Sequence, residues 1–253
     1  MTSWVQAFSP RWQVWAVATA AAVLTGCAHQ SSTKTDAQAP DLVPLSQVVP
    51  QAQQDMRYFG ANNFMGRPIA GYEAPACWLS RPAAMSLAKV QQALAAQGMT
   101  LKVFDCYRPQ TAVDDFVRWG KDLQDQKTKA QYYPNVPKEE LFTRGYIAEK
   151  SGHSRASTVD LTVAVVDSQR ASQVVKGPLR NGGEVDMGTP FDMFDVRSHT
   201  ENPDMSPDVR HNRLWLRALM DQHGWNNLPE EWWHFTLRDE PYPKQFFDVP
   251  VRR

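Results

Sequence analysis

Residues 151–160 read SGHSRASTVD, and the fold and chemistry of the chain can be worked outward from this stretch. His153 and Asp160 are two good metal ligands, but seven residues separate them, too many for one helix face. From Thr158 onward, apolar and smaller or polar residues alternate, which predicts a strand. On that strand the side chain of Asp160 lies on the face opposite the valines. His153 then approaches the same point from the preceding loop.

A metal site needs a third ligand, and residues 230–235, EEWWHF, offer a histidine beside carboxylates. One aspartate and two histidines with an open fourth position are typical of a hydrolytic zinc rather than a structural one. The sequence therefore predicts one Zn²⁺ per chain, bound by His153, Asp160 and His234. His199 is the rival for the third ligand.

Two glutamates compete for the role of general base beside this zinc. Glu231 lies three residues before His234, so in a straight strand the two side chains would point to opposite faces. Both reach the metal only if the chain bends near Trp232. Glu230 lies four residues before His234 and shares its parity, so it stays open as the alternative.

Several separated motifs, in order along the chain, resemble the zinc D-alanyl-D-alanine dipeptidases of the VanX type. They are NFMGRP at residues 63–68, DCYRP at 105–109, the stretch 151–162, EWWH at 231–234 and RDEPYP at 238–243. The resemblance runs from about residue 58 to residue 250. It departs from the family at Ala156, where glycine is usual, and at residues 167–185, which look like an insertion.

The resemblance implies roles for further residues. It assigns the general base to Glu231 and the stabilisation of the tetrahedral oxyanion to Arg108, a planar and permanent cation. For substrate binding it implies Asp192 for the ammonium group and Ser151 for the carboxylate, with Tyr58 as a third contact. A closed pocket gated by residues 132–137 and 167–185 would favour the dipeptidase.

Composition is consistent with one sizeable domain. The chain has 253 residues, 42% of them hydrophobic, and a formal net charge of zero. The charge balance argues against a nucleic-acid partner, and nothing indicates a protein partner. Helices are predicted from Ser80 to Gly98, from Gln110 to Leu123 and from Ser206 to His223. Without regular βαβ spacing, this predicts an α+β domain over residues 41–253, with a small central antiparallel sheet flanked by helices and the zinc site at the sheet.

The N-terminus reads as an export signal. An apolar run from Val14 to Leu24 is shorter than the roughly 20 residues of a membrane-spanning helix. The following LTGC, residues 24–27, resembles a lipoprotein signal-peptidase site. We therefore expect residues 1–26 to be removed, Cys27 to carry lipid, and residues 27–40 to form a tether on the periplasmic side of a bacterial envelope. In an oxidising compartment Cys77 and Cys106 are expected to form a disulfide.

These observations predict a periplasmic enzyme, anchored to the membrane only through its lipid, that hydrolyses the free dipeptide D-alanyl-D-alanine during cell-wall turnover or D-alanine recovery. One alternative is a zinc D,D-carboxypeptidase or endopeptidase that acts on longer peptidoglycan peptides. A remoter alternative is a lipoprotein that binds wall fragments without cleaving them. An open groove favours the first alternative, and a closed pocket favours the dipeptidase.

Overall fold

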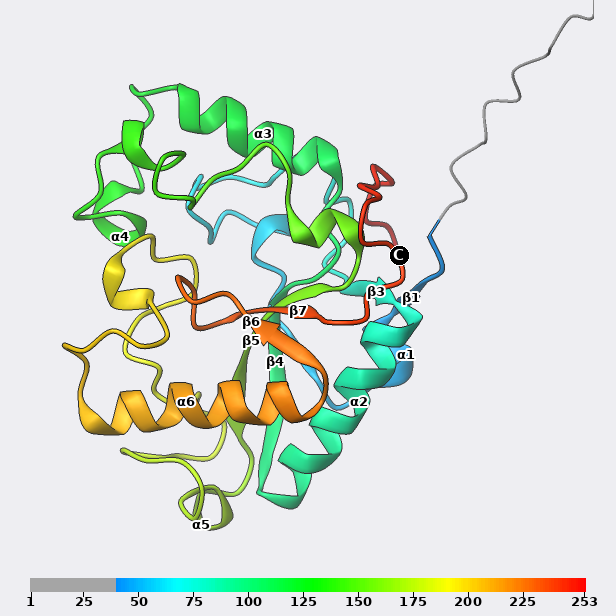
Figure 1. Ribbon diagram of the computed structural model, residues 1–253, viewed down its shortest axis with the longest axis vertical. Helices are drawn as coiled ribbons and strands as arrows, with labels where there is room; N and C mark the ends of the chain where they lie inside the picture. Colours follow the sequence, from blue (N-terminus) through cyan, green and yellow to red (C-terminus); the bar gives the residue numbers. More distant parts are fainter. Residues whose placement is uncertain (1–39) are drawn as a thin grey trace, which may run out of the picture. The chain divides into compact units, whose positions relative to one another are not determined.

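A five-stranded sheet forms the centre of residues 40–253, the part of the chain that the computed structural model describes (Figure 1). Its strands lie in the order β2 (Gln53–Gln54), β4 (Met99–Asp105), β5 (Thr158–Val165), β7 (His234–Leu237) and β6 (Trp225–Asn227). Neighbouring strands are antiparallel except β2 and β4, which are parallel. The predicted antiparallel sheet is thus confirmed for four strands, but its β2 edge makes it mixed. The chain between β2 and β4 is long enough for a crossover, which a parallel pair requires.

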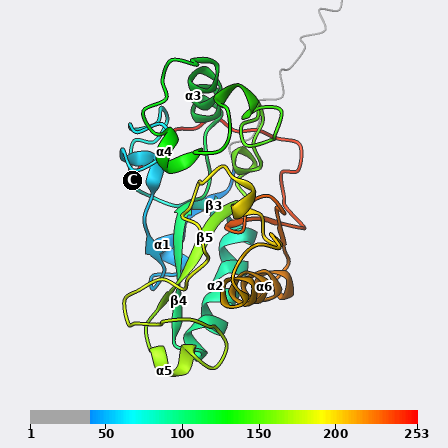
Figure 2. The same ribbon diagram turned by 90° about the vertical axis from the view of Figure 1, so that its left-hand side faces the viewer.

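Two long helices pack side by side on one face of the sheet, as Figure 2 shows. They are α2 (Arg81–Ala96) and α6 (Pro207–Gln222), and both agree closely with the ranges predicted from the sequence. The hydroxyl of Ser86 on α2 donates to the carbonyl of His223 at 2.7 Å, which fixes the two helices to each other. Helix α3 (Gln110–Lys121) follows β4 and lies beyond the end of the sheet (Figure 1).

Short elements complete the domain. Strands β1 (Leu42–Pro44) and β3 (Trp78–Ser80) form a separate antiparallel pair. The remaining short helices and 3-10 turns are α1 (Leu45–Val48), η1 (Arg57–Phe59), α4 (Lys129–Tyr132), η2 (Lys138–Glu140), η3 (Gly152–Arg155), α5 (Ser168–Ala171) and η4 (Val196–Ser198). None of the described helices has the length and apolar character needed to cross a membrane.

Residues 167–185, the segment that resembles an insertion, contribute to the sheet. After α5 the chain returns along the second half of β5, where the N–H of Val165 donates to Gly183 at 2.8 Å. The N–H of Val185 donates to Val163 at 2.9 Å. Strand β7 pairs only with residues 158–160 of β5. The insertion therefore supplies hydrogen-bond partners for backbone groups in the second half of β5, where β7 does not pair.

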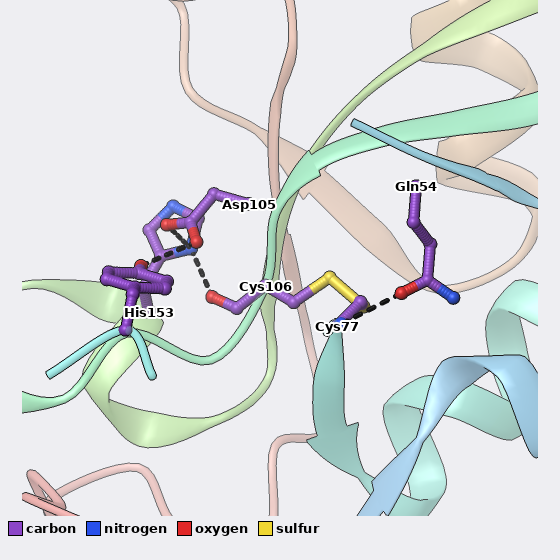
Figure 3. Close-up of a disulfide and its surroundings, with 6 residues drawn as sticks. Gln54, Cys77, Asp105, Cys106 and His153 are labelled. Atoms are coloured by element: carbon purple, nitrogen blue, oxygen red, sulfur yellow. Dashed lines mark hydrogen bonds and ion pairs between the residues drawn. A yellow bond between two sulfur atoms is a disulfide. The ribbon is translucent and has the colours of Figure 1, made fainter. Parts of the chain in front are cut away.

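A disulfide joins Cys77, just before β3, to Cys106, just after β4 (Figure 3). Both residues are buried, and the bond connects the small β1–β3 pair to the end of the central sheet. The pairing is the one expected from the sequence. The expected signal peptide, lipid-bearing Cys27 and most of the tether lie outside the described residues.

Candidate active site

The three expected zinc ligands come together on one face of the sheet. Asp160 on β5 lies directly opposite His234 on β7, and η3 brings His153 above them. Oδ1 of Asp160 is 3.3 Å from Nε2 of His153 and 3.1 Å from Nδ1 of His234. The two histidine nitrogens are 3.4 Å apart. Three potential ligand atoms therefore form a nearly equilateral triangle.

This triangle has the dimensions of three corners of a zinc tetrahedron. With bonds of about 2.0–2.1 Å, tetrahedral ligands lie roughly 3.3–3.4 Å from one another. Oδ1 of Asp160 is buried and has no hydrogen-bond partner, so a cation would satisfy it. Burial tends to raise the pKa of Asp160, but His153 and His234 outweigh it and hold that pKa well below its usual range. Within residues 40–253 this is the one group of His, Cys, Asp and Glu side chains arranged to hold a metal.

The main chain at the end of β4 orients His153. Its Nδ1 donates to the carbonyl of Cys106 at 2.7 Å and lies 3.4 Å from Oδ2 of Asp105 (Figure 3). Because Nδ1 carries the proton for this bond, the lone pair of Nε2 faces the site. Such outer contacts fix the ring and tautomer of a ligating histidine. One hydrogen bond therefore joins the disulfide-bonded Cys106 to His153, an expected metal ligand.

A side-chain hydrogen bond begins the η3 turn that carries His153, and a residue in the left-handed region ends it. Ser151 accepts a hydrogen bond from the N–H of His153 at 3.2 Å and begins η3. Ala156 ends η3 with a φ of 65°, in the left-handed region that favours glycine. A side chain there costs roughly 1–2 kcal/mol. The glycine usual in the family at this position has a physical reason, and this chain forms the same turn with alanine.

Glu231 and His234 face the site together because the chain turns between them. The N–H of His234 donates to the carbonyl of Glu231 at 3.2 Å, and β7 begins only at His234. Nδ2 of Asn227 donates to the carbonyl oxygens of Glu231 and His234, each at 3.0 Å. These two bonds hold the turn against β6. The bend required for Glu231 is thus present. The rival base, Glu230, is exposed and does not line the pocket.

The environment of Glu231 suits proton transfer. Its carboxylate lies 3.5 Å from Nδ1 of His234, and its side chain is 14% exposed. Burial is the main cause that raises its pKa to about 7. A general base is most effective when its pKa lies near the working pH.

Arg108 follows β4 and reaches the metal face of the sheet. Its Nε and Nη2 are each 2.9 Å from Oδ2 of Asp105, and Nη2 is 3.7 Å from Asp160. Its guanidinium also lies over the rings of Tyr58 and Phe116. These contacts fix a largely buried cation beside the three ligands, which is the requirement for stabilising an oxyanion.

A cavity of about 310 Å³ opens over the ligands, and all three expected substrate residues line it. Tyr58 donates a buried hydrogen bond of 2.8 Å to Oδ2 of Asp192. Burial and the nearby Asp160 raise the pKa of Asp192 well above its ordinary value. An ammonium group placed in the cavity would supply the missing positive charge. Ser151 lies on the η3 side of the same cavity.

Two possibilities raised by the sequence are not realised around this pocket. The pocket is enclosed by residues 145–148 and 150–153, whereas neither 132–137 nor 167–185 lines it. The insertion is instead occupied in pairing with β5. His199, the rival ligand, lines a different surface hollow with Glu201 and Asp204.

Two supporting residues were not identified from the sequence. Asp105 holds Arg108 and His153, and Tyr72 donates to it at 2.6 Å. Asn227 holds the Glu231 turn. Asp105 belongs to the DCYRP motif, but only its position opposite Asp160 in the sheet reveals what it contacts.

Comparisons with known proteins agree with this geometry. A family model described as D-ala-D-ala dipeptidase, Peptidase_M15, matches residues 38–252. A D-alanyl-D-alanine dipeptidase of Enterococcus faecium is 38% identical over 208 residues, which cover 82% of this chain and 96% of the relative. One from Streptomyces coelicolor is 36% identical over 211 residues, 83% of this chain and 98% of the relative.

More distant matches were also found. The D-alanyl-D-alanine dipeptidase of Escherichia coli is 29% identical over 197 residues, 78% of this chain and 84% of the relative. A solved structure of a vancomycin-resistance D,D-pentapeptidase with Zn(II) overlaps at a TM-score of 0.36 and 14% identity. That overlap covers 66% of this chain and 76% of the other, too weak a likeness to carry an argument.

The fold and the site together fit a metallopeptidase: two histidines and an aspartate are arranged as metal ligands at a mixed sheet, and a buried glutamate adjoins them. Within that class, the chain belongs to the D-ala-D-ala dipeptidase family. The resemblance found in the sequence is thereby confirmed, and membership of this family implies zinc as the metal.

Proposed function

We propose that this protein hydrolyses the free dipeptide D-alanyl-D-alanine to two molecules of D-alanine. One observation carries the proposal: the family's relatives with this name match nearly their whole length, and the residues for the chemistry converge on one pocket. His153, Asp160 and His234 would hold the zinc. Glu231, Arg108 and all three ligands are present, so the alternative of a non-catalytic binding protein finds no support.

The residues of this chain divide the chemistry between them. Zinc supplies Lewis acidity that polarises the peptide carbonyl and activates water. Glu231 accepts a proton from the attacking water and delivers it to the leaving amine. Arg108, fixed by Asp105, stabilises the negative charge that forms on the carbonyl oxygen. Each turnover consumes one water and leaves Glu231 in its starting protonation state.

The buried Asp192 supports a free dipeptide over a longer peptide. A carboxylate closed off from water needs a cation, and the free amino terminus of a dipeptide provides one. A longer peptide has an amide nitrogen at that position. It leaves Asp192 without a charged partner.

A comparison of free and blocked substrates tests this selectivity. We expect kcat/KM for N-acetyl-D-Ala-D-Ala to be at least about 30-fold below that for D-Ala-D-Ala, because an unpaired buried charge costs roughly 2–5 kcal/mol. Asp192→Asn should narrow the gap by slowing hydrolysis of the free dipeptide more than that of the blocked one. Equal rates on both substrates would favour the carboxypeptidase-like alternative.

We also propose that the enzyme works in a bacterial periplasm, held at the membrane by lipid on Cys27. The LTGC sequence supports lipidation, and a disulfide is typical of an exported protein. Recovery of D-alanine during wall turnover is the role that this location favours. Incorporation of labelled fatty acid into the full-length protein, and its loss in Cys27→Ala, would be the expected result. An unlabelled wild-type protein would contradict the anchor.

A further inference from the structure

One corner of the pocket is unexplained by the metal and its neighbours. A Cβ built on Gly152 would lie 2.8 Å from Oγ1 of Thr158 and 3.6 Å from Oγ1 of Thr236. The same point is 3.5 Å from Nη2 of Arg155. The φ of Gly152 is not in the left-handed region, so what demands glycine there is space. Glycine therefore lets the η3 loop pack directly against Oγ1 of Thr158, with the Arg155 guanidinium and Oγ1 of Thr236 close to the same point.

Hydrogen-bond donors converge on this corner. Oγ1 of Thr158 and Oγ1 of Thr236 are 2.9 Å apart, so one of the two hydroxyls donates to the other. The second hydroxyl hydrogen is then left for a further acceptor. Nε of Arg155 donates to Glu240 at 2.8 Å. The other edge of its guanidinium still carries donors, and the side chain is 20% exposed.

Arg155 is the cation of the pocket best suited to bind an anion. Of the described residues that line the cavity, three are lysine or arginine. Arg108 is already held by Asp105 and lies beside the metal ligands. Lys150 is exposed, with its ammonium 5.0 Å from the centre of the Phe246 ring. Of these three cations, Arg155 alone is partly buried and has a free guanidinium edge. The groups beside that edge are neutral hydroxyls and not carboxylates.

The position of this corner along the sheet fits the length of a dipeptide. Thr158 pairs with Thr236 two residues away from the Asp160–His234 pair, about 6–7 Å along the same face. The terminal carboxylate of a dipeptide lies within one residue, roughly 3.8 Å, of the bond that is cleaved. A hydrogen bond of about 2.8 Å extends that reach to roughly 6–7 Å, so a donor at this corner can contact the carboxylate when the scissile carbonyl lies at the metal ligands.

We propose that Arg155 determines specificity by binding the C-terminal carboxylate of the substrate, together with the hydroxyl of Thr236, which lines the cavity in front of the buried Thr158. This inference rests on the proposed dipeptidase function. The pocket would then be polarised, with Asp192 at the ammonium end and Arg155 at the carboxylate end. Glu240 positions the guanidinium through Nε and leaves its other edge for the substrate.

The test compares D-Ala-D-Ala with D-Ala-D-alaninamide, which lacks the terminal charge. Relative to the wild type, Arg155→Ala should lower kcat/KM for the acid by at least about 30-fold, mostly through KM, because a charged hydrogen-bonding partner is lost. For the amide, kcat/KM of the same variant should stay within about 3-fold of the wild-type value. Arg155→Lys should recover part of the loss, since it keeps the charge without the planar fork.

Glu240→Gln is the matched control. It breaks the same ion pair but keeps the guanidinium and its charge, so it should lower kcat/KM for the acid by much less than Arg155→Ala does. The proposal would be overturned if Arg155→Ala lowered kcat/KM equally for the acid and the amide. It would also be overturned if Arg155→Ala and Glu240→Gln lowered kcat/KM for the acid equally, because the ion pair would then have only a structural role. Zinc content and melting temperature show whether each variant is folded, and Arg155→Lys carries the test if Arg155→Ala is not. Failure of the zinc-loaded wild type to cleave D-Ala-D-Ala would refute the proposed function itself.

Discussion

Replacing His234 with alanine is expected to remove zinc from the protein and to abolish hydrolysis. Among residues 40–253, three side chains form the ligand group, so none is spare. Loss of an outer-shell partner alone weakens metal binding by about 10–100-fold, and loss of a direct ligand should exceed that range. His153→Ala and Asp160→Ala should behave in the same way. Metal analysis of the purified variants, against about one zinc per chain in the wild type, measures the effect.

His199→Ala is the natural control for this experiment. His199 lies in a different surface hollow, so its loss should leave the zinc content unchanged. Full zinc retention in His234→Ala, with loss in His199→Ala, would show that the ligand set is wrong.

Glu231→Gln is expected to keep its zinc and to lose activity by roughly 10²–10⁴-fold, the usual contribution of a positioned acid–base group. Glutamine has nearly the same shape but cannot accept the proton from water. The carboxylate contacts His234 at 3.5 Å without belonging to the ligand triangle, so metal binding should survive the change. Steady-state rates on D-Ala-D-Ala, together with metal analysis, separate the two effects.

Glu230→Gln serves as its control because the neighbouring side chain is exposed and outside the pocket. It should retain nearly wild-type activity. An inactive Glu230→Gln beside an active Glu231→Gln would mean that the turn before β7 has been misinterpreted.

Much of the fold could be predicted because its main elements carry strong local patterns. Strand β5 shows alternation, and α2 and α6 show apolar stripes with clear ends, so their ranges agree with the structure within a few residues. Strand β7 begins only at His234. The residues before it form a turn held by Asn227, a contact from another strand that no local pattern reveals.

The candidate site, like the fold, could be predicted only in part from the sequence. His153, Asp160 and His234 were predicted because histidine and aspartate near a strand are a chemical signal in themselves. Asp105 was missed as a supporting residue, and Arg155 was not considered, because their partners, Arg108 and Glu240, are ordinary ion-pair partners in any sequence. What distinguishes these pairs is the pocket beside them, and a pocket depends on which strands are neighbours. The parallel pairing of β2 was missed for the same reason.

Release of D-alanine from D-Ala-D-Ala by the purified protein tests the central claim most directly. The rate should be high with one equivalent of zinc, fall to background after the metal is removed with a chelator, and return when zinc is restored. No release of D-alanine by the zinc-loaded protein, or a rate that does not depend on the metal, would contradict the account.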